Sequence, residues 1–271
     1  YSTDLSPNLV TNLDLVKKDC NSSSDLIIRR FTLGSSEKDE GAIVFIDGLV
    51  DKKQVEWSIL RPLMLMGDHV SGKLDPSDPL KYMESRLITV GEVYRGEKLE
   101  NIVAGIMSGN TVLLLNGSKE ALIIATPGWE KRGVEQPDAE VIIKGPREGF
   151  VETLRSNTAL LRRRLGDPGL TFENLQLGRE TKTDVCIAAI KGIVAPGLVE
   201  ELKRRLQRID TDGVVAAGTI EEFIEDAPFS IFATVGNTER PDVVCAKLLE
   251  GRAAVLVDGT PVALTVPLLY V

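Results

Sequence analysis

Short apolar runs alternate along the chain with segments whose apolar residues recur at helical spacing. Leu198, Leu202 and Leu206 recur among charged residues at the interval of one helical turn and predict an amphipathic helix. Strands are predicted where branched apolar residues cluster, at 26–33, 42–46, 170–177 and 185–190. Helices interleaved with such strands predict a mixed α/β (α+β) fold, in which helices cover small sheets.

This pattern occurs twice. Each half carries a predicted helix that stops at a glycine, followed by a strand pair that turns through Asn-Gly or Asp-Gly, dipeptides that tolerate the positive φ angles of tight hairpins. Corresponding positions keep a near-constant offset of about 142 to 145 residues, as expected of a sequence repeat. The matched positions are Leu33-Gly34 with Leu177-Gly178, Gly48 with Gly192, Gly91 with Gly236, Gly109 with Gly251, and Asn116-Gly117 with Asp258-Gly259. We therefore predict two similar α/β subdomains from an internal duplication.

A segment between the two copies is predicted to join them. It ends in a helix with Phe150, Leu154 and Leu161 on one side, and Gly166-Asp167-Pro168 terminates that helix. The expected boundaries are an N-terminal subdomain at 1–127, a bridging segment with a linker helix at 128–165, and a C-terminal subdomain at 166–271.

Composition and charge exclude several classes of protein. The net charge of −8 argues against a nucleic-acid surface. No stretch approaches the ~18 consecutive apolar residues of a transmembrane helix, so we expect any membrane-spanning part to lie outside this sequence. Cys20, Cys186 and Cys245 are far apart in the sequence and are expected to be reduced residues of the core.

The residues that usually carry catalysis or bind metals are sparse. His69 is the only histidine, which argues against a zinc site and against a Ser-His-Asp triad. Residues 67–73 spell the Gly-x-x-x-x-Gly-Lys of a phosphate-binding loop, but Leu74 stands where that loop needs Ser or Thr. Asp47 follows a predicted buried strand, a usual place for a functional polar residue. We expect no metal, no cofactor and no enzymatic activity.

Two long segments carry a more specific signal. The first holds a Gly-Pro turn, an isolated phenylalanine, an asparagine and a triple arginine, and the second combines a Glu-Arg-Pro-Asp run with a later Asp-Gly-Thr-Pro turn. In this order they resemble the two signatures of the A subunits of GerA-type spore germination receptors, and the resemblance extends from about Pro7 to Pro267. The first signature is 135–165, and the second comprises 238–242, 248–252 and 258–261.

The resemblance implies a soluble N-terminal domain of a receptor subunit whose membrane part lies beyond this sequence. It implies a place in the spore inner membrane, with this domain facing the cytoplasm or spore core. The implied partners are a transporter-like subunit, a lipoprotein-like subunit and further copies of the same subunit. The function expected on this basis is regulatory: receptor assembly and transmission of a nutrient signal.

A second hypothesis is a small-molecule module that binds the nutrient in a cleft between or within the subdomains. Trp57, Trp129 and the few other aromatic residues are scattered along the chain, which weakens that hypothesis.

Candidate binding or interaction residues come from the two signatures. Arg162, Arg163 and Arg164 either end a solvated helix, or at least one of them reaches across to a carboxylate of the other lobe. The possible partners are Glu148, Glu152 and Glu239. The candidates are Gly145, Pro146, Arg147, Glu148, Phe150, Asn157, Arg162, Arg163, Glu239, Arg240, Asp242, Asp258, Gly259 and Pro261.

Overall fold

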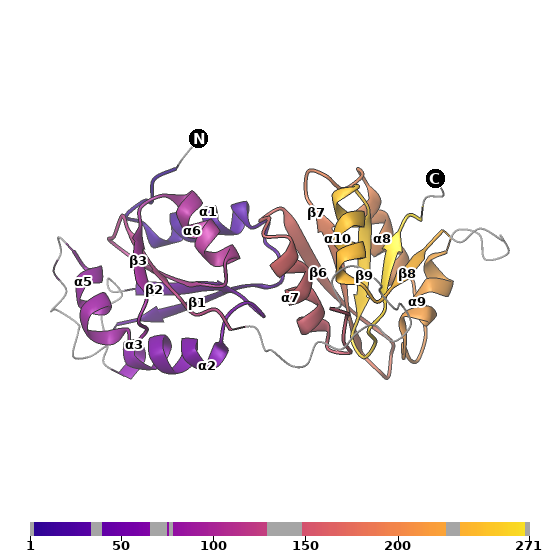
Figure 1. Cartoon of the computed structure of the whole chain (residues 1–271), viewed down its shortest axis with the longest axis horizontal. Helices are drawn as coiled ribbons and strands as arrows, with labels where there is room; N and C mark the ends of the chain where they lie inside the picture. Colours follow the sequence, from indigo (N-terminus) through magenta and orange to yellow (C-terminus); the bar gives the residue numbers. More distant parts are fainter. Residues whose placement is uncertain are drawn as a thin grey trace. The chain divides into compact units, whose positions relative to one another are not determined.

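The computed structural model describes residues 3–33, 40–65, 75, 78–128, 148–225 and 234–268. The chain divides into two compact units, Tyr1–Glu130 and Lys131–Val271. Each unit is described by itself (Figure 1).

The first unit is built on a five-stranded sheet whose paired neighbours are all antiparallel, in the order β1-β2-β4-β5-β3. The strands are β1 (Leu26–Thr32), β2 (Glu40–Ile46), β3 (Val93–Gly96), β4 (Thr111–Leu115) and β5 (Ala121–Ile124). One face carries α1 (Leu9–Asp19) and α6 (Leu99–Met107). The other carries α2 (Lys52–Val55), η2 (Glu56–Leu60), α3 (Arg61–Leu65), α5 (Leu80–Tyr82) and η3 (Met83–Leu87).

The second unit repeats this architecture, with strand order β6-β7-β9-β10-β8. Its strands are β6 (Leu170–Leu177), β7 (Thr183–Ile190), β8 (Gly236–Thr238), β9 (Ala253–Val257) and β10 (Ala263–Val266). One face carries α7 (Leu154–Arg164) and α10 (Pro241–Leu249). The opposite face carries α8 (Leu198–Gln207) and α9 (Ala217–Ile224).

The mixed α/β fold and the two similar subdomains expected from the sequence are therefore confirmed, because the two sheets have the same strand order. The copies differ from our expectation at their beginning. Each copy opens with a helix, α1 or α7, and not with a strand. The helix that we placed in a bridging segment is α7, and it packs on the second sheet with Leu160 and Leu161 in that unit's core.

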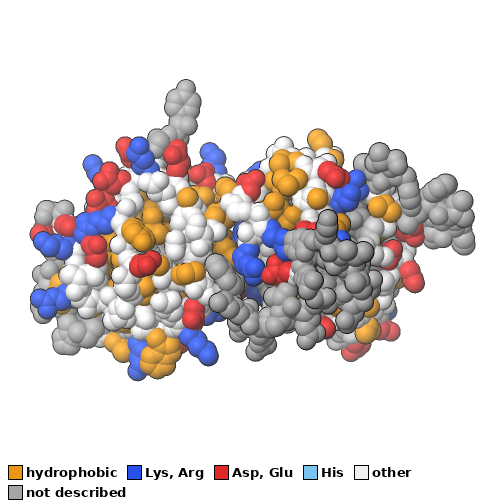
Figure 2. Space-filling model, in the orientation of Figure 1, with side chains coloured by type: hydrophobic (Ala, Val, Ile, Leu, Met, Phe, Trp, Pro, Cys, Tyr) orange, Lys and Arg blue, Asp and Glu red, His pale blue; other side chains and the backbone are white. Residues whose placement is uncertain are grey.

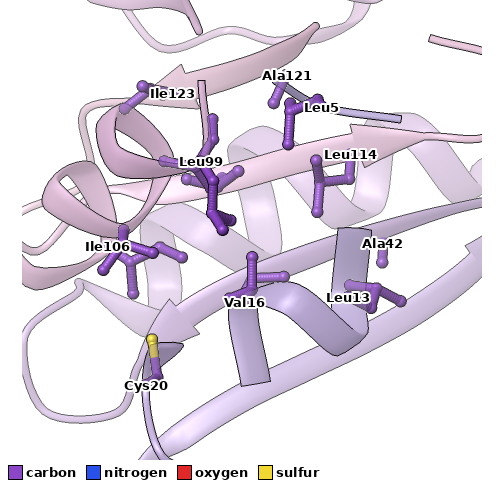
Figure 3. Packing of buried hydrophobic residues seen from close by; sticks show 14 of the residues in the cluster. Leu5, Leu13, Val16, Cys20, Ala42, Leu99, Ile106, Leu114, Ala121 and Ile123 are labelled. Atoms are coloured by element: carbon purple, nitrogen blue, oxygen red, sulfur yellow. The ribbon is translucent and has the colours of Figure 1, made fainter. Parts of the chain in front are cut away.

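Central strands are covered on both faces, which explains why their sequences are apolar throughout and do not alternate. In β2, every residue from Ala42 to Ile46 is buried. Ala42 and Val44 face α1 and α6, whereas Ile43 and Phe45 face the opposite helices. Figure 3 shows the first of these layers, with side chains of α1 and α6 meeting those of the sheet; it labels Leu5, Leu13, Val16, Cys20, Ala42, Leu99, Ile106, Leu114, Ala121 and Ile123.

The glycines that were expected to end helices adopt the left-handed backbone that this role requires. Gly109 follows α6 with φ +82° and Gly251 follows α10 with φ +85°. A Cβ at either position would also lie within 3 Å of a backbone oxygen, 2.9 Å from that of Leu49 and 2.8 Å from that of Ile193. Cys20, Cys186 and Cys245 are buried, as expected.

Candidate functional site

Asn157 fastens the segment that precedes α7 to the helix itself. Its Oδ1 accepts a hydrogen bond from the Val151 backbone N–H at 2.8 Å, and its Nδ2 donates to the Val151 carbonyl at 2.6 Å. In the first unit, Asn12 makes the same pair of bonds with the Ser6 backbone, at 2.8 and 2.7 Å. Both asparagines are buried, so each satisfies two backbone groups that would otherwise be unpaired at a helix entry.

The hairpin turn at Asp258-Gly259 closes on the start of the same helix. Asp258 Oδ1 accepts a hydrogen bond from the Leu154 backbone N–H at 2.9 Å. Gly259, with φ +86°, donates its N–H to the Glu152 carbonyl at 2.7 Å. The first and last signature segments therefore meet in the fold, although Leu154 and Asp258 are 104 positions apart in the sequence.

The first unit repeats this closure with Asn116 in place of the aspartate. Asn116 Oδ1 accepts from the Leu9 N–H at 3.2 Å, and Gly117 donates to the Pro7 carbonyl at 2.7 Å. A third shared contact joins the segment before α7 to the segment before α10: Phe150 donates its N–H to the Glu239 carbonyl at 2.8 Å. Its counterpart is the bond from Leu5 to the Glu97 carbonyl, also at 2.8 Å.

These shared contacts assign several candidate residues to the scaffold. Five residues of the second unit make the same hydrogen bonds as their counterparts in the first: Asn157, Asp258, Gly259 and, through their backbones, Phe150 and Glu239. A feature present in one copy alone is a better candidate for a specialised role.

An ion-pair network on α7 and the segment before it is such a feature. Glu148 accepts from Arg163 Nη2 at 2.9 Å through Oε1 and from Arg164 Nη2 at 2.8 Å through Oε2. The Glu148 side chain is only 17% exposed, so one half-buried carboxylate holds two guanidinium groups. In Figure 2, basic and acidic side chains lie side by side where Figure 1 shows α7.

A second pair lies at the start of α10, which packs against α7. Arg240 Nη2 and Asp242 Oδ2 are 2.7 Å apart. Partial burial raises the pKa of Asp242, but the hydrogen bond and charge of Arg240, with a further contribution from Arg164, outweigh it and hold that pKa below its usual value. Arg164 therefore acts electrostatically on both pairs. We call Glu148, Arg163, Arg164, Arg240 and Asp242 the α7–α10 charge network.

The first unit does not carry this network. The corresponding positions hold Lys18 and Asp19 at the end of α1, and Lys98 and Glu100 at the start of α6. No ion pair joins these four residues in the described part of the first unit. The same packing of two helices on a sheet thus forms without such ion pairs, so the fold alone does not account for the network.

Arg162 differs from its two neighbours. It is 1% exposed and donates through Nη1 to the carbonyls of Leu170 at 2.8 Å and Asp167 at 3.2 Å. Its guanidinium carbon lies 5.0 Å from the centroid of the Phe172 ring, a cation–π distance. We expected at least one arginine of this run to reach a carboxylate of the other lobe. The contacts described here for Arg162, Arg163 and Arg164 instead lie within the second unit.

Comparison with known proteins identifies the family. Residues 14–271 match the family model described as Bacillus/Clostridium GerA spore germination protein. The chain belongs to the GerA family. It is 36% identical over 267 residues to spore germination protein KA of Bacillus subtilis (strain 168), covering 98% of this chain and 48% of that protein. It is also 36% identical over 266 residues to the B. subtilis membrane protein YfkQ, covering 98% of this chain and 50% of that protein.

A solved structure matches the GerA-family chain along its whole length. It is the crystal structure of the N-terminal domain of the A subunit of the Bacillus megaterium spore germinant receptor GerK3, with 34% identity and a TM-score of 0.78, covering 100% of this chain and 99% of that one. The chain spans about half the length of the curated relatives it matches. No helix in the described residues is long and apolar enough to cross a membrane.

Several candidates of the GerA signatures lie elsewhere or outside the described residues. Gly145, Pro146 and Arg147 are outside them, as is the phosphate-loop-like segment 67–74 with His69. Pro261 is half-buried just after the Asp258-Gly259 turn. Asp47 is buried, and its Oδ1 lies 2.7 Å from Lys52 Nζ. The residues that the structure describes contain no group of His, Cys, Asp and Glu able to hold a metal ion.

Two residues of the GerA-family chain were not on our list of candidates. Arg164 belongs to the triple arginine, but nothing in three consecutive arginines says which of them touch Glu148. Arg252 lies in the 248–252 signature, and its buried side chain donates to the Pro267 carbonyl at 3.2 Å and pairs with Glu250 at 2.8 Å. A run of charged residues beside an apolar helix face is the only sequence signal that these two share.

Proposed function

We propose that this chain is the regulatory and assembly domain of a spore germination receptor subunit, and that the α7–α10 charge network shapes the surface through which it contacts its neighbours. The observation that carries the proposal is the presence of the network in one copy only of a duplicated fold. Both copies need the same helix packing, yet only the second has five charged side chains from two signature segments in contact or electrostatic reach.

The state of these charges favours protein contact over ligand binding or catalysis. Each carboxylate already has a guanidinium partner, at 2.7 to 2.9 Å. The five side chains are 17 to 31% exposed, so the network reaches the surface. Their ion pairs fix the positions of the charged groups. Fixed, half-exposed charges of both signs suit a partner of complementary charge, because such groups give orientation and selectivity to an interface.

The receptor context follows from the relatives. One relative is named a membrane protein, and the solved structure is named as a domain of a receptor A subunit. We infer that the rest of this subunit spans the spore inner membrane and that this domain faces the spore core. Its partners there are a transporter-like subunit, a lipoprotein-like subunit and further copies of itself.

The test uses the full-length subunit in spores. Arg163→Ala and Arg164→Ala each remove one contact of Glu148, and Lys18→Ala removes the charge at the matched position of the first unit. We expect the two arginine variants to lower receptor abundance, and with it the germination response, for every nutrient alike. The Lys18→Ala control is expected to leave both unchanged.

Receptor level, quantified beside the nutrient response, separates this function from the nutrient-binding hypothesis. An arginine variant with a normal receptor level and a shifted response to one nutrient alone would show that the domain recognises that nutrient. Equal losses in the arginine variants and in the Lys18→Ala control would show that the network has no special role.

A further inference from the structure

A groove in the first unit lies between α1 and β1. Its volume is about 660 Å³, and apolar and charged side chains both line it. Apolar residues of the helix and strand, Leu13, Leu26 and Ile28 among them, form its floor. Charged residues sit at its rim: Asp14, Lys17 and Arg30.

The strand beside the groove is an edge of its sheet. Within the described strands, β1 pairs only with β2, through the register that places Ile28 opposite Val44. Leu26, Ile28 and Arg30 alternate along β1 and line the groove, so the intervening residues point to the other face. Among the described residues no strand pairs with the other edge of β1, so the backbone N–H and C=O groups on that edge can pair with a further strand.

The charged side chains at the rim have no ion-pair partner among the described residues. Lys17 and Arg30 form no ion pair in the described part of the chain, and neither does Asp14. Two cations against one anion give the groove a positive balance in a chain whose net charge is −8. An anionic occupant is therefore the electrostatic complement.

The matched place in the second unit is lined by different side chains. Phe172 lies opposite Ala188 in β6 and β7, where Ile28 lies opposite Val44 in the first unit. Arg162 corresponds to Lys17 on the opening helix, and its guanidinium lies buried over the Phe172 ring. The larger Phe and the inserted Arg occupy the space that the smaller Ile and the exposed Lys leave open in the first unit.

We propose that this groove receives an extended acidic segment of a partner protein, which adds to β1 as a further strand. Every second residue of the segment faces the groove, and these groove-facing residues alternate between acidic and apolar. With the backbone paired to β1, an apolar side chain then lies over Ile28 and carboxylates lie at Lys17 and Arg30. Strand addition of this kind draws affinity from main-chain hydrogen bonds and selectivity from pockets for alternate side chains. The inference rests on the proposed assembly role and names one kind of partner segment.

Basic residues on an edge strand also protect it from unwanted pairing. That role needs charge alone, whereas this edge combines charge with an open apolar floor. Arg30 repels a strand with basic side chains and attracts a strand with acidic side chains. The same residue therefore disfavours basic partner strands and favours acidic ones.

The test measures binding of synthetic peptides to the purified chain by fluorescence anisotropy at low ionic strength. The probe is a fluorescent peptide in which every second residue is alternately Glu and Val, with Thr at the positions between them, so that one face of the strand carries both kinds of side chain. One control has the same residues with all Glu in one block and all Val in another, and a second has alternate amides N-methylated. We expect the alternating peptide to bind, and both controls to bind about tenfold more weakly, because each loses one determinant of strand addition.

Variants of the groove identify the site. Arg30→Glu is expected to weaken binding of the alternating peptide about tenfold, since it replaces attraction by repulsion. Arg29→Glu makes the same charge change on the same strand but on its opposite face, and is expected to have little effect. Ile28→Phe, which copies the second unit, is expected to weaken binding by filling the floor, with the thermal unfolding of each variant checked alongside.

Three results would overturn the inference: no binding of the alternating peptide, equal losses from Arg29→Glu and Arg30→Glu, or indifference to N-methylation. The inference would also be overturned if a small branched carboxylic acid displaced the peptide and bound with the same affinity as the peptide. The groove would then be a small-molecule site. None of these results bears on the receptor-abundance experiment, which depends on Arg163 and Arg164.

Discussion

Asp258 accepts a hydrogen bond from the backbone N–H of Leu154 at 2.9 Å, which ties the last hairpin of the second unit to its first helix. The first residues of a helix have N–H groups without an intrahelical acceptor, and this carboxylate supplies one. A negative charge at a helix N-terminus is also favoured by the helix dipole. The bond therefore closes the unit from its end back to its beginning.

Asp258→Ala should remove this bond and destabilise the second unit by about 1 kcal/mol, the usual effect of losing a helix-capping acceptor. Asp258→Asn should retain most of the stability, because Asn116 makes the matched bond in the first unit at 3.2 Å. Urea unfolding of the purified chain checks both. An Asp258→Asn variant as unstable as Asp258→Ala would mean that the charge, and not the hydrogen bond, is the source of the stability.

Gly259 is expected to tolerate asparagine better than valine. Its φ is +86°, a region in which a β-branched residue is strained, and no atom lies within 4 Å of the position a Cβ would take. Gly259→Val should therefore lose about 1–2 kcal/mol through backbone strain alone. Asn adopts left-handed backbone more readily, so Gly259→Asn should lose less. Thermal melting that ranks asparagine below valine would contradict the strain explanation.

The duplication could be predicted from the sequence because it is marked by residues with strict backbone demands. Gly109, Gly251 and the Asn-Gly and Asp-Gly turns recur where the chain needs positive φ, and the structure places glycines with positive φ at those sites. The apolar runs at 42–46 and 185–190 also predicted β2 and β7, since strands covered on both faces have little room for polar residues.

The opening helix of the first unit was missed although its signal was present. Leu9, Leu13, Val16 and Cys20 recur at helical spacing and are all buried. Recognising α1 would have identified α7 as its partner in the repeat. We placed α7 in a bridge because its matched position in the first copy had no assigned element.

The site was only partly predictable. Glu148 was named as a partner of the arginines, and its contacts with Arg163 and Arg164 agree with that. Three consecutive helical positions point in directions about 100° apart, so one arginine can be buried while its neighbours reach the surface. Which one is buried depends on Phe172 and on the loop at Asp167, and no local pattern reveals those contacts.

Acid should weaken the contribution of Asp242 to stability. Its folded-state pKa lies below its usual value of 3.8, so the carboxylate stabilises the fold at neutral pH. That contribution is lost as the pH falls through 3.8 toward the folded-state pKa, because the unfolded chain then binds the proton first. Asp242→Asn should reduce stability by about 0.5–1 kcal/mol at pH 7, and the difference from wild type should shrink below about pH 4. Urea unfolding at several pH values measures this. Glu222→Gln, at an exposed carboxylate, is the control for the loss of one negative charge.

Arg162 and Arg163 are adjacent in the sequence, but their loss should have different consequences. Arg162→Ala leaves the carbonyls of Leu170 and Asp167 without this donor and opens a cavity beside Phe172. An unsatisfied buried acceptor at the Leu170 carbonyl and a cavity together are expected to lower the stability of the second unit by about 3 kcal/mol or more. Arg163→Ala removes a side chain that is 31% exposed and paired with Glu148 at 2.9 Å, for which a loss within about 1 kcal/mol is expected.

Comparing the two variants separates stability from function. Arg162→Lys should lie between wild type and Arg162→Ala, because lysine keeps the charge and some packing but loses the planar fork that donates to the carbonyls and stacks on the ring. Denaturant unfolding of the purified chain ranks the three, and receptor abundance in spores is measured for the same substitutions. In Arg162→Ala, abundance should fall because the domain unfolds. In Arg163→Ala, abundance should fall although the purified domain remains nearly as stable as wild type, because the altered surface no longer meets its partner. If Arg163→Ala destabilised the purified domain as much as Arg162→Ala, the charge network would be part of the scaffold, and its restriction to the second unit would need another cause.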